Sequence, residues 1–136
     1  MANVLKIKQN VIDKIIAHAK QDAPIEACGY LADKYGIIVK HFQLTNTDAS
    51  KEQFSLDPRE QFAAIRKMRE EGLSVCAVYH SHPVSPARPS EEDIKLAYDP
   101  NLSYVIISLA DGLENIRSFR IRKGEVSEEK VEVIVG

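Results

Sequence analysis

The sequence predicts a mixed α/β (α+β) fold, with a central mixed β-sheet flanked by helices. Three observations favour this class: apolar stripes at helical spacing alternate with strand-like segments, two short apolar runs are typical of strands buried on both faces, and the C-terminal region alternates apolar and polar residues. The chain has 136 residues, of which 44% are apolar. At roughly 150 residues per domain, we expect residues 1–136 to form a single domain.

The charge balance argues against two classes of partner. The 18 lysines and arginines and 20 acidic residues give a net charge of −2. Because no global positive field would attract phosphates, we expect neither nucleic acid nor a membrane as a partner. Two lysines interrupt the apolar residues near the N-terminus, and no run approaches the roughly 18 apolar residues of a spanning helix. We therefore expect a cytoplasmic protein.

The N-terminal third of the chain predicts one helix followed by strands. Asn10 is a plausible N-cap for a helix over residues 11–20, whose apolar residues form one stripe, and Pro24 ends it. Residues 26–44 alternate apolar runs with a turn-like segment, which indicates two or more strands. The polar residues 45–51 predict a loop.

A second helix is predicted from its N-terminal signals. Asp57 can act as the cap, Pro58 fits the first helical position, and Glu60 can reach back to the cap amide. Gly72 ends this helix. Its inward face is expected to carry three apolar residues, Phe62, Ile65 and Met68, or their neighbours.

The remaining elements complete the alternation. Residues 73–79 and 104–109 are apolar runs that predict buried strands, and a third helix is expected from Ser90 to about residue 98. Residues 116–135 read as a hairpin that turns at Lys123-Gly124.

The chemically informative segment begins where the first buried strand ends. Side chains two apart on a strand point to the same side, so His80 and His82 can present two imidazoles to one point while Ser81 faces away. A stiff, proline-rich loop follows and can return Asp93 to a fixed place. Two histidines and one carboxylate suit zinc and leave a fourth tetrahedral position for water.

Simpler interpretations exist for each of these residues. Ser90 and Asp93 have the spacing of a capping box, and a single histidine at a strand end is commonly solvated or hydrogen-bonded. The joint pattern favours the metal interpretation. Cys28 and Cys76 lie in apolar surroundings, are expected to be buried reduced thiols, and are not expected to be ligands.

The same residues resemble a known family. His80-Ser81-His82-Pro83, six residues, Ser90, two residues and Asp93 fit the HxHPx6SxxD signature of the JAMM (MPN-plus, Mov34/PAD-type) zinc metalloproteases, in their small standalone prokaryotic form. Glu26, which begins the segment Glu-Ala-Cys-Gly-Tyr-Leu, looks like that family's catalytic glutamate. The resemblance implies a JAMM/MPN domain with a cytidine-deaminase-like fold.

What the resemblance implies about the site can be stated residue by residue. His80, His82 and Asp93 would bind one Zn²⁺ per chain, and Glu26 would be the general base that activates the zinc-bound water. Ser90 would donate a hydrogen bond toward the developing oxyanion or the water. The implied enzyme is a metallopeptidase that hydrolyses an amide or isopeptide bond without a covalent intermediate.

The implied substrate is the C-terminus of a small ubiquitin-like or sulfur-carrier protein, because the chain is little longer than the minimal domain of the family. The alternative is a noncatalytic MPN-fold scaffold, but such relatives typically lack ligands or the glutamate, and all five residues are present here. Nucleobase deamination would require a Pro-Cys-x-x-Cys ligand pair, which the sequence lacks. The sequence indicates no oligomeric state.

Other candidate residues favour structural interpretations. His18 and His41 lack ligand spacing and are expected to be structural or solvated. Cys28 lacks the cationic neighbours that would activate a thiol nucleophile. A basic set on the hairpin is compatible with an acidic partner or with a solvated strand face; it comprises Arg117, Arg120, Arg122 and Lys123.

Overall fold

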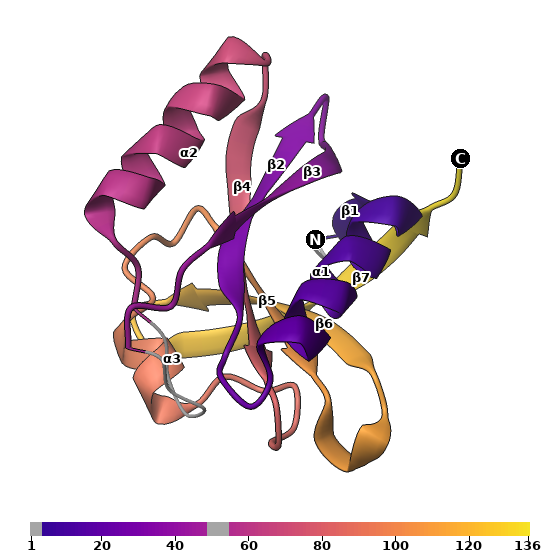
Figure 1. Ribbon diagram of the computed structural model, residues 1–136, viewed down its shortest axis with the longest axis vertical. Helices are drawn as coiled ribbons and strands as arrows, with labels where there is room; N and C mark the ends of the chain where they lie inside the picture. Colours follow the sequence, from indigo (N-terminus) through magenta and orange to yellow (C-terminus); the bar gives the residue numbers. More distant parts are fainter. Residues whose placement is uncertain (1–3, 49–54) are drawn as a thin grey trace.

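The computed structural model describes residues 4–48 and 55–136, and these residues form a seven-stranded mixed sheet. The strand order is β1-β3-β2-β4-β5-β6-β7, and β1 closes the sheet into a barrel by pairing in parallel with both β3 and β7 (Figure 1). The strands are β1 (Val4–Lys8), β2 (Cys28–Lys34), β3 (Ile37–Leu44), β4 (Ser74–His82), β5 (Ser103–Ser108), β6 (Asn115–Arg122) and β7 (Glu125–Ile134). The helices are α1 (Gln9–Asp22), α2 (Pro58–Glu70), α3 (Glu91–Lys95) and the 3-10 turn η1 (Ala110–Gly112).

The expected mixed sheet flanked by helices is confirmed, but the first strand was not anticipated. Leu5 and Ile7 point into the core from β1. The strand runs directly into α1, and Lys8, which is paired with Ile134, holds the N-cap position without a side-chain cap bond. The prediction that Asn10 caps this helix is therefore wrong, because strand pairing rather than a capping side chain sets where the helix begins.

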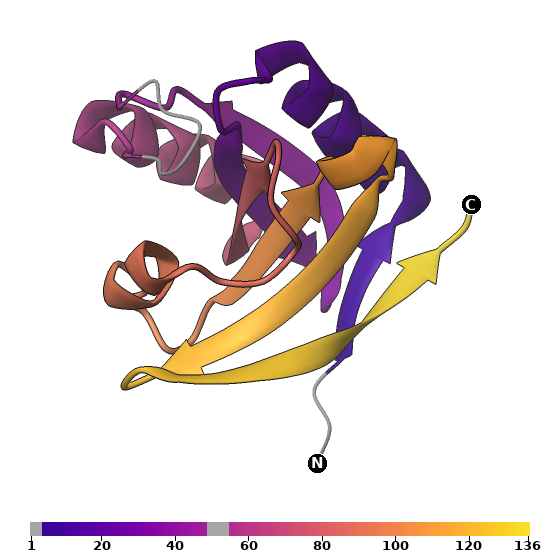
Figure 2. The ribbon, with the colours of Figure 1, turned by 90° about the horizontal axis from the view of Figure 1, so that it is seen from below.

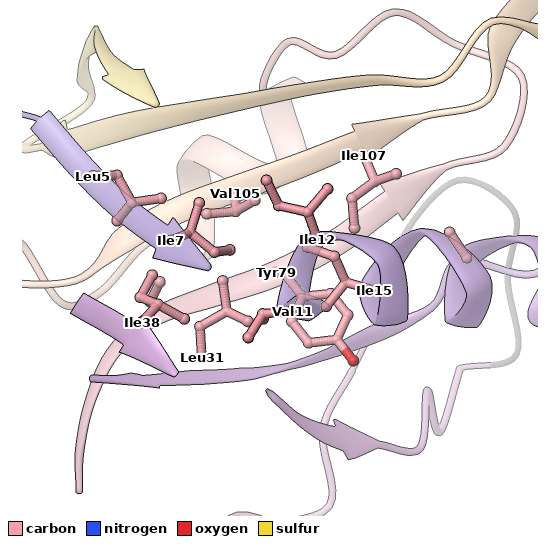
Figure 3. Packing of buried hydrophobic residues seen from close by; sticks show 12 residues of the cluster. Leu5, Ile7, Val11, Ile12, Ile15, Leu31, Ile38, Tyr79, Val105 and Ile107 are labelled. Carbon is pink, nitrogen blue, oxygen red and sulfur yellow. The ribbon is translucent and has the colours of Figure 1, made fainter. Parts of the chain in front are cut away.

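The larger core cluster lies between α1 and the sheet, and Figure 2 shows this helix next to the strands. The predicted stripe of α1 is buried there, with Val11 and Ile15 almost fully enclosed. Figure 3 shows these side chains against Leu31 of β2, Tyr79 of β4 and Ile107 of β5. This arrangement uses one face of β4 and its neighbours.

Helix α2 covers the opposite face of β2 and β4. Its buried residues are Ala64 and Met68, and Ile65 is half-buried, whereas the Phe62 side chain is 77% exposed. The prediction that Phe62 faces the core is wrong. Gln61 hydrogen-bonds the Tyr30 hydroxyl at 2.8 Å, so it faces the sheet, and the next residue, about 100° further round the helix, turns toward solvent.

The predicted cap of α2 is confirmed only in part. The Asp57 side chain accepts from the Arg59 amide at 2.8 Å, and Pro58 occupies the first turn as expected. Glu60 does not reach back to the cap. Its carboxylate accepts instead from the Thr45 amide at 2.8 Å and hydroxyl at 2.9 Å. This contact fastens the helix to the end of β3, which sequence spacing does not reveal.

Two predicted boundaries shift. Strand β4 extends beyond residue 79 through His82, and α3 ends at Lys95, three residues before the expected end. The C-terminal hairpin is confirmed, with Lys123 and Gly124 both at positive φ in its turn. Of the loop predicted over residues 45–51, residues 49–51 lie outside the described residues. Within the described ranges no helix is long and apolar enough to cross a membrane.

Candidate metal centre

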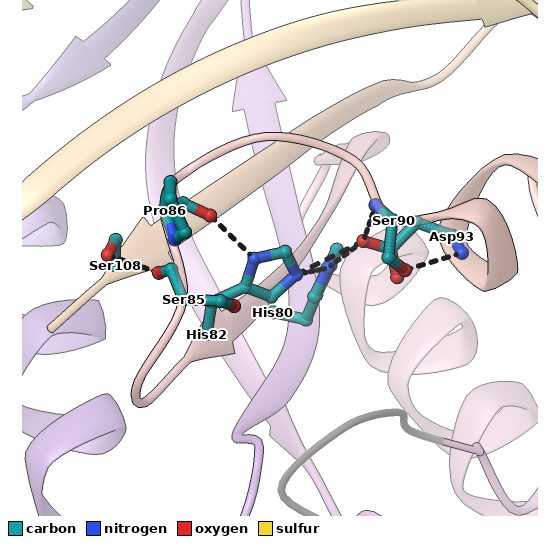
Figure 4. A network of polar contacts seen from close by, with 7 residues as sticks. All are labelled: His80, His82, Ser85, Pro86, Ser90, Asp93 and Ser108. Carbon is teal, nitrogen blue, oxygen red and sulfur yellow. Dashed lines mark hydrogen bonds and ion pairs between the residues drawn. The ribbon is translucent and has the colours of Figure 1, made fainter. Parts of the chain in front are cut away.

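The two histidines of the motif and the aspartate meet at one end of β4. His80 and His82 lie on the face of β4 that also carries Val78, while Ser81 points to the other face. The Asp93 Oδ2 atom lies 3.1 Å from each Nε2 atom, and the two Nε2 atoms are 3.1 Å apart (Figure 4). All three side chains are buried. The structure therefore brings together the three predicted ligands.

The spacing of these three atoms fits a metal ion. Four-coordinate zinc with bonds of about 2.0–2.1 Å has neighbouring ligand atoms about 3.3 Å apart, close to the triangle formed here. The Nδ1 atom of His82 lies 2.8 Å from the Pro86 carbonyl oxygen, which can only accept a hydrogen bond. In the neutral ring the proton is therefore on Nδ1, and Nε2 presents its lone pair to the centre of the triangle.

The electrostatics of the centre favour an ionised carboxylate. Burial alone would raise the pKa of Asp93, but hydrogen bonds with His80, His82 and the Ser90 amide hold it well below its usual range. For His82, burial acts to lower the pKa, and the contacts with Asp93 and the Pro86 carbonyl outweigh burial and raise it. The carboxylate is thus already charged before any cation binds.

Asp93 serves two purposes at once. The Ser90 hydroxyl accepts from the Asp93 amide at 3.0 Å, and the Ser90 amide donates to Asp93 Oδ2 at 2.9 Å, which is the predicted capping box. The capping and ligand interpretations therefore hold together. Since the Ser90 oxygen accepts in this bond, its own O–H proton remains available to donate.

Contacts that sequence reasoning missed fix the loop between the ligands. The Ser108 hydroxyl donates to the Ser85 carbonyl at 2.6 Å, and the Leu109 amide donates to the His82 carbonyl at 3.1 Å (Figure 4 shows the first). Together with the Pro86 contact, these bonds fasten the loop to the end of β5. They involve backbone carbonyls, so no residue type in the sequence signals them.

Glu26 lies two residues before the start of β2, the strand that pairs with β4 and places Cys28 opposite His80. The neighbouring Ala27 amide donates to the Ser81 hydroxyl at 2.8 Å, and the Ser81 amide donates to the Ala27 carbonyl at 2.9 Å. The Glu26 side chain is 2% exposed, and its Oε1 atom has no hydrogen-bond partner among the described residues. Burial raises its pKa to about 8, His82 opposes this rise, and Asp93 adds to it.

The remaining candidates are structural. Cys28 is buried and Cys76 half-buried, and burial raises the pKa of each thiol to about 12, so neither is an activated nucleophile. His18 is enclosed between the Tyr79 hydroxyl and Asp22, as expected of a structural histidine. Among the described residues, the group that could hold a metal ion consists of His80, His82 and Asp93, and it includes neither cysteine and not His18.

The basic set on the hairpin is partly engaged within the sheet. Arg117 lies 3.5 Å from Glu128 on the paired strand, and Arg120 contacts the Ser103 hydroxyl at 3.3 Å. Arg122 and Lys123 are exposed at the turn. These contacts favour the solvated-strand interpretation of the set.

The fold and the site together define a class, that of mixed α/β proteins with a two-histidine, one-aspartate metal-binding group at the end of a central strand. A family model described as prokaryotic homologs of the JAB domain matches residues 8–122. The chain therefore belongs to the prokaryotic JAB/JAMM domain family, and the resemblance noted from the motif is confirmed.

Similar proteins include peptidases. The CysO-cysteine peptidase of Mycobacterium tuberculosis is 38% identical over 96% of this chain and 92% of its own length. A probable TtuB-protein conjugate cleaving protease of Thermus thermophilus is 32% identical over 90% of this chain and 79% of its own length. The solution structure of protein DSY2949 from Desulfitobacterium hafniense has a TM-score of 0.89 at 40% identity, covering 98% of this chain and 94% of that one.

Proposed function

We propose that this protein is a zinc metallopeptidase that hydrolyses the amide or isopeptide bond at the C-terminus of a small ubiquitin-like or sulfur-carrier protein. His80, His82 and Asp93 would hold one Zn²⁺ per chain. The observation that carries the proposal is the buried Glu26, which precedes the strand paired with the histidine strand and whose pKa is affected by His82 and Asp93 of this three-ligand group. The relatives named for cleaving CysO-cysteine and TtuB conjugates support the substrate class.

A bound zinc ion would supply a Lewis acid that polarises the scissile carbonyl and acidifies water. Glu26 would accept a proton from the attacking water and later deliver it to the leaving amine. Burial raises the pKa of Glu26 to about 8 in the metal-free chain, and a bound cation would lower this pKa toward the working pH, where the group can take and return a proton. Its Oε1 atom, without a hydrogen-bond partner among the described residues, is available to water.

Ser90 would contribute to the same step. The cap bond fixes the position of its hydroxyl oxygen, and the hydroxyl proton can be directed at the oxygen on which negative charge develops. The capping box thereby orients a donor before the substrate arrives. We further propose a cytoplasmic location, where the two free thiols would stay reduced.

The competing function is a noncatalytic scaffold of the same fold. A buried carboxylate with an unsatisfied oxygen costs folding stability, and a protein that only bound partners would gain nothing from it. The retention of this costly group at the metal centre favours catalysis.

The test is the intact mass of CysO bearing a C-terminal cysteine after incubation with the zinc-loaded protein. We expect loss of the terminal residue with the native chain and none with Glu26→Gln, although both bind one zinc per chain. Full zinc occupancy with no mass change in either sample would contradict the peptidase and favour the scaffold. Cleavage by the Glu26→Gln form would remove the proposed base.

A further inference from the structure

The loop that leads from the ligand histidines to Asp93 (Figure 4) borders a hollow next to the metal centre. This hollow has a volume of about 380 Å³, and it is lined by His82, Ser85, Pro86, Arg88, Pro89 and Ser90. The lining thus includes one proposed zinc ligand and the proposed oxyanion donor. Among these six residues, Arg88 alone carries a permanent charge.

The backbone that carries Arg88 is held in place on its N-terminal side. Ala87 is buried and packs in a small core cluster with Ile106 of β5 and Phe119 of β6. The Arg88 amide donates to the Pro86 carbonyl at 2.8 Å, and the same carbonyl oxygen lies 2.8 Å from the Nδ1 atom of the second ligand histidine. The arginine side chain therefore starts from a fixed point beside the ligands.

The charge of Arg88 is not neutralised by its neighbours. Its side chain is exposed and forms no ion pair with another residue in the described ranges. Of the acidic residues that follow it in the sequence, Glu92 pairs with Lys95, and Asp93 is bound by the two histidines. The guanidinium donors of Arg88 are thus available to an anion that enters the hollow.

Arg88 and Glu26 approach the metal centre from different neighbours of β4. Glu26 precedes β2, whereas the loop that carries Arg88 is fastened to β5 and packs on β5 and β6. Strand β4 lies between β2 and β5 in the sheet. A substrate bond at this centre therefore has the proposed base on one side of β4 and a fixed cation on the other.

The anion that suits this position is the carboxylate of a C-terminal residue. In a terminal residue the carboxylate carbon lies only about 2.5 Å from the amide nitrogen that hydrolysis releases. A guanidinium that binds this carboxylate would lie within about 7 Å of that nitrogen. In an isopeptide bond the released nitrogen is a lysine Nζ atom, and four methylenes separate it from a main chain that has no free carboxylate at an internal lysine. A cation next to the metal centre therefore distinguishes the two kinds of substrate.

We propose that Arg88 binds the α-carboxylate of the residue that is released, so that the protein removes one C-terminal amino acid from its carrier in preference to cleaving an isopeptide bond. This inference rests on the proposed function and narrows its substrate class. The planar guanidinium can bind a carboxylate through two parallel hydrogen bonds. In the reaction, the oxygen of water joins the carbonyl carbon, the C–N bond breaks and the leaving nitrogen gains a proton. The products are the carrier with a new carboxylate and one free amino acid.

The test compares CysO bearing a C-terminal cysteine with CysO bearing a C-terminal cysteinamide, in which a neutral amide replaces the carboxylate. We expect the native zinc-loaded chain to favour the acid about tenfold or more in kcat/KM, as for one charged hydrogen-bonded pair. Arg88→Ala should lose this factor on the acid and little on the amide, and Arg88→Lys should recover part of the loss. Arg122→Ala, an exposed arginine at the hairpin turn, is the matched control and should leave both substrates unchanged.

A second readout does not depend on turnover. Titration of the zinc-loaded Glu26→Gln chain with the two carriers should show tighter binding of the acid. Arg88→Ala, added to the Glu26→Gln chain, should remove this difference, while the zinc content stays at one per chain because Arg88 is not a ligand.

Several outcomes would overturn the inference. Equal cleavage of acid and amide by the native chain would show that the carboxylate is not recognised. Equal losses of Arg88→Ala on both carriers would assign Arg88 to the reacting carbonyl or to the loop, and a native preference for a lysine isopeptide conjugate of CysO would reverse the proposed substrate class. If the native chain cleaves neither carrier, the proposed function fails for CysO, and the titration still decides: a preference for the acid that requires Arg88 supports the inference, and equal binding refutes it.

Discussion

The two faces of β4 differ in how completely their polar groups are satisfied. On the α1 face, the Tyr79 hydroxyl and His18 lie 2.8 Å apart and His18 continues to Asp22 at 3.1 Å, so each buried polar group has a partner. On the other face, His80 and His82 converge on one carboxylate oxygen, and the Oε1 atom of Glu26 has no hydrogen-bond partner among the described residues. Because side chains alternate between the two faces of β4, residues that stabilise the core and residues of the metal-binding group occupy neighbouring positions in one strand.

We expect a bound metal ion to stabilise the protein through the face of β4 that carries His80 and His82. At free zinc about a thousandfold above Kd, binding should add about 4 kcal/mol to the free energy of unfolding, because the cation satisfies the converging ligands. Asp93→Asn should remove most of this gain, while Glu91→Gln, an exposed carboxylate on the same short helix, should keep it. Urea unfolding with and without zinc measures the difference. An equal gain in both variants would place the zinc elsewhere.

The α1 face should be the less tolerant of added volume. A Cβ atom at Gly29 would lie 2.4 Å from the Phe42 carbonyl oxygen and 2.5 Å from the Tyr79 ring, so the backbone or the ring must move. We expect Gly29→Ala to cost about 3 kcal/mol in urea unfolding of the metal-free protein. A cost below about 0.5 kcal/mol, typical of surface substitutions, would contradict this packing.

The pH dependence of the free energy of unfolding should reveal the cost of burying the ionised Glu26 carboxylate. Its pKa is raised from 4.5 to about 8 by burial, so between these values the unfolded chain releases the proton while the folded chain retains it. The contribution of Glu26 to the free energy of unfolding is therefore fully present below pH 4.5 and is lost as the pH rises through 8. Glu26→Gln should make the metal-free protein more stable than native at pH 8, by at most about 4 kcal/mol, the difference shrinking toward pH 4.5.

The measurement is chemical unfolding of both chains after chelation, at several pH values across this window. A difference that does not change with pH would show that Glu26 is not protonated in the folded state. Restoring zinc should shrink the difference at pH 8, since the cation favours the ionised carboxylate.

The smallest expected effect concerns the satisfied polar pair. Tyr79→Phe removes the hydroxyl from His18 and should cost about 1 kcal/mol, because a buried ring nitrogen loses its partner. Tyr104→Phe, whose hydroxyl contacts the Asp99 backbone near the surface, should cost less than about 0.5 kcal/mol. Thermal unfolding compares the two. Zinc affinity should not change in either, and a loss of zinc in Tyr79→Phe would mean that the two faces are coupled.

Sequence patterns succeeded where the structure is set by neighbours along the chain. The stripe of α1, the cap of α2 at Asp57, the capping box of α3 and the hairpin turn at Lys123 all follow from local geometry. They failed at Asn10 and Phe62, because β1 pairing and the Gln61 contact with Tyr30 decide where a helix begins and which way it turns. These are contacts between distant residues.

The sequence by itself determined the metal-ligand set, since two histidines two residues apart on a strand must share a face, and a proline-rich loop followed by a capping box returns Asp93 to a fixed place. Only the tertiary structure decided that Glu26 lies beside that set. Ala27 and Ser81, which are 54 positions apart in the sequence, are brought together by pairing of β2 with β4, and no local pattern measures such a distance. Only the tertiary structure also decided that Phe62 is exposed to solvent, because packing of the whole helix outweighs the free energy gained by burying one side chain.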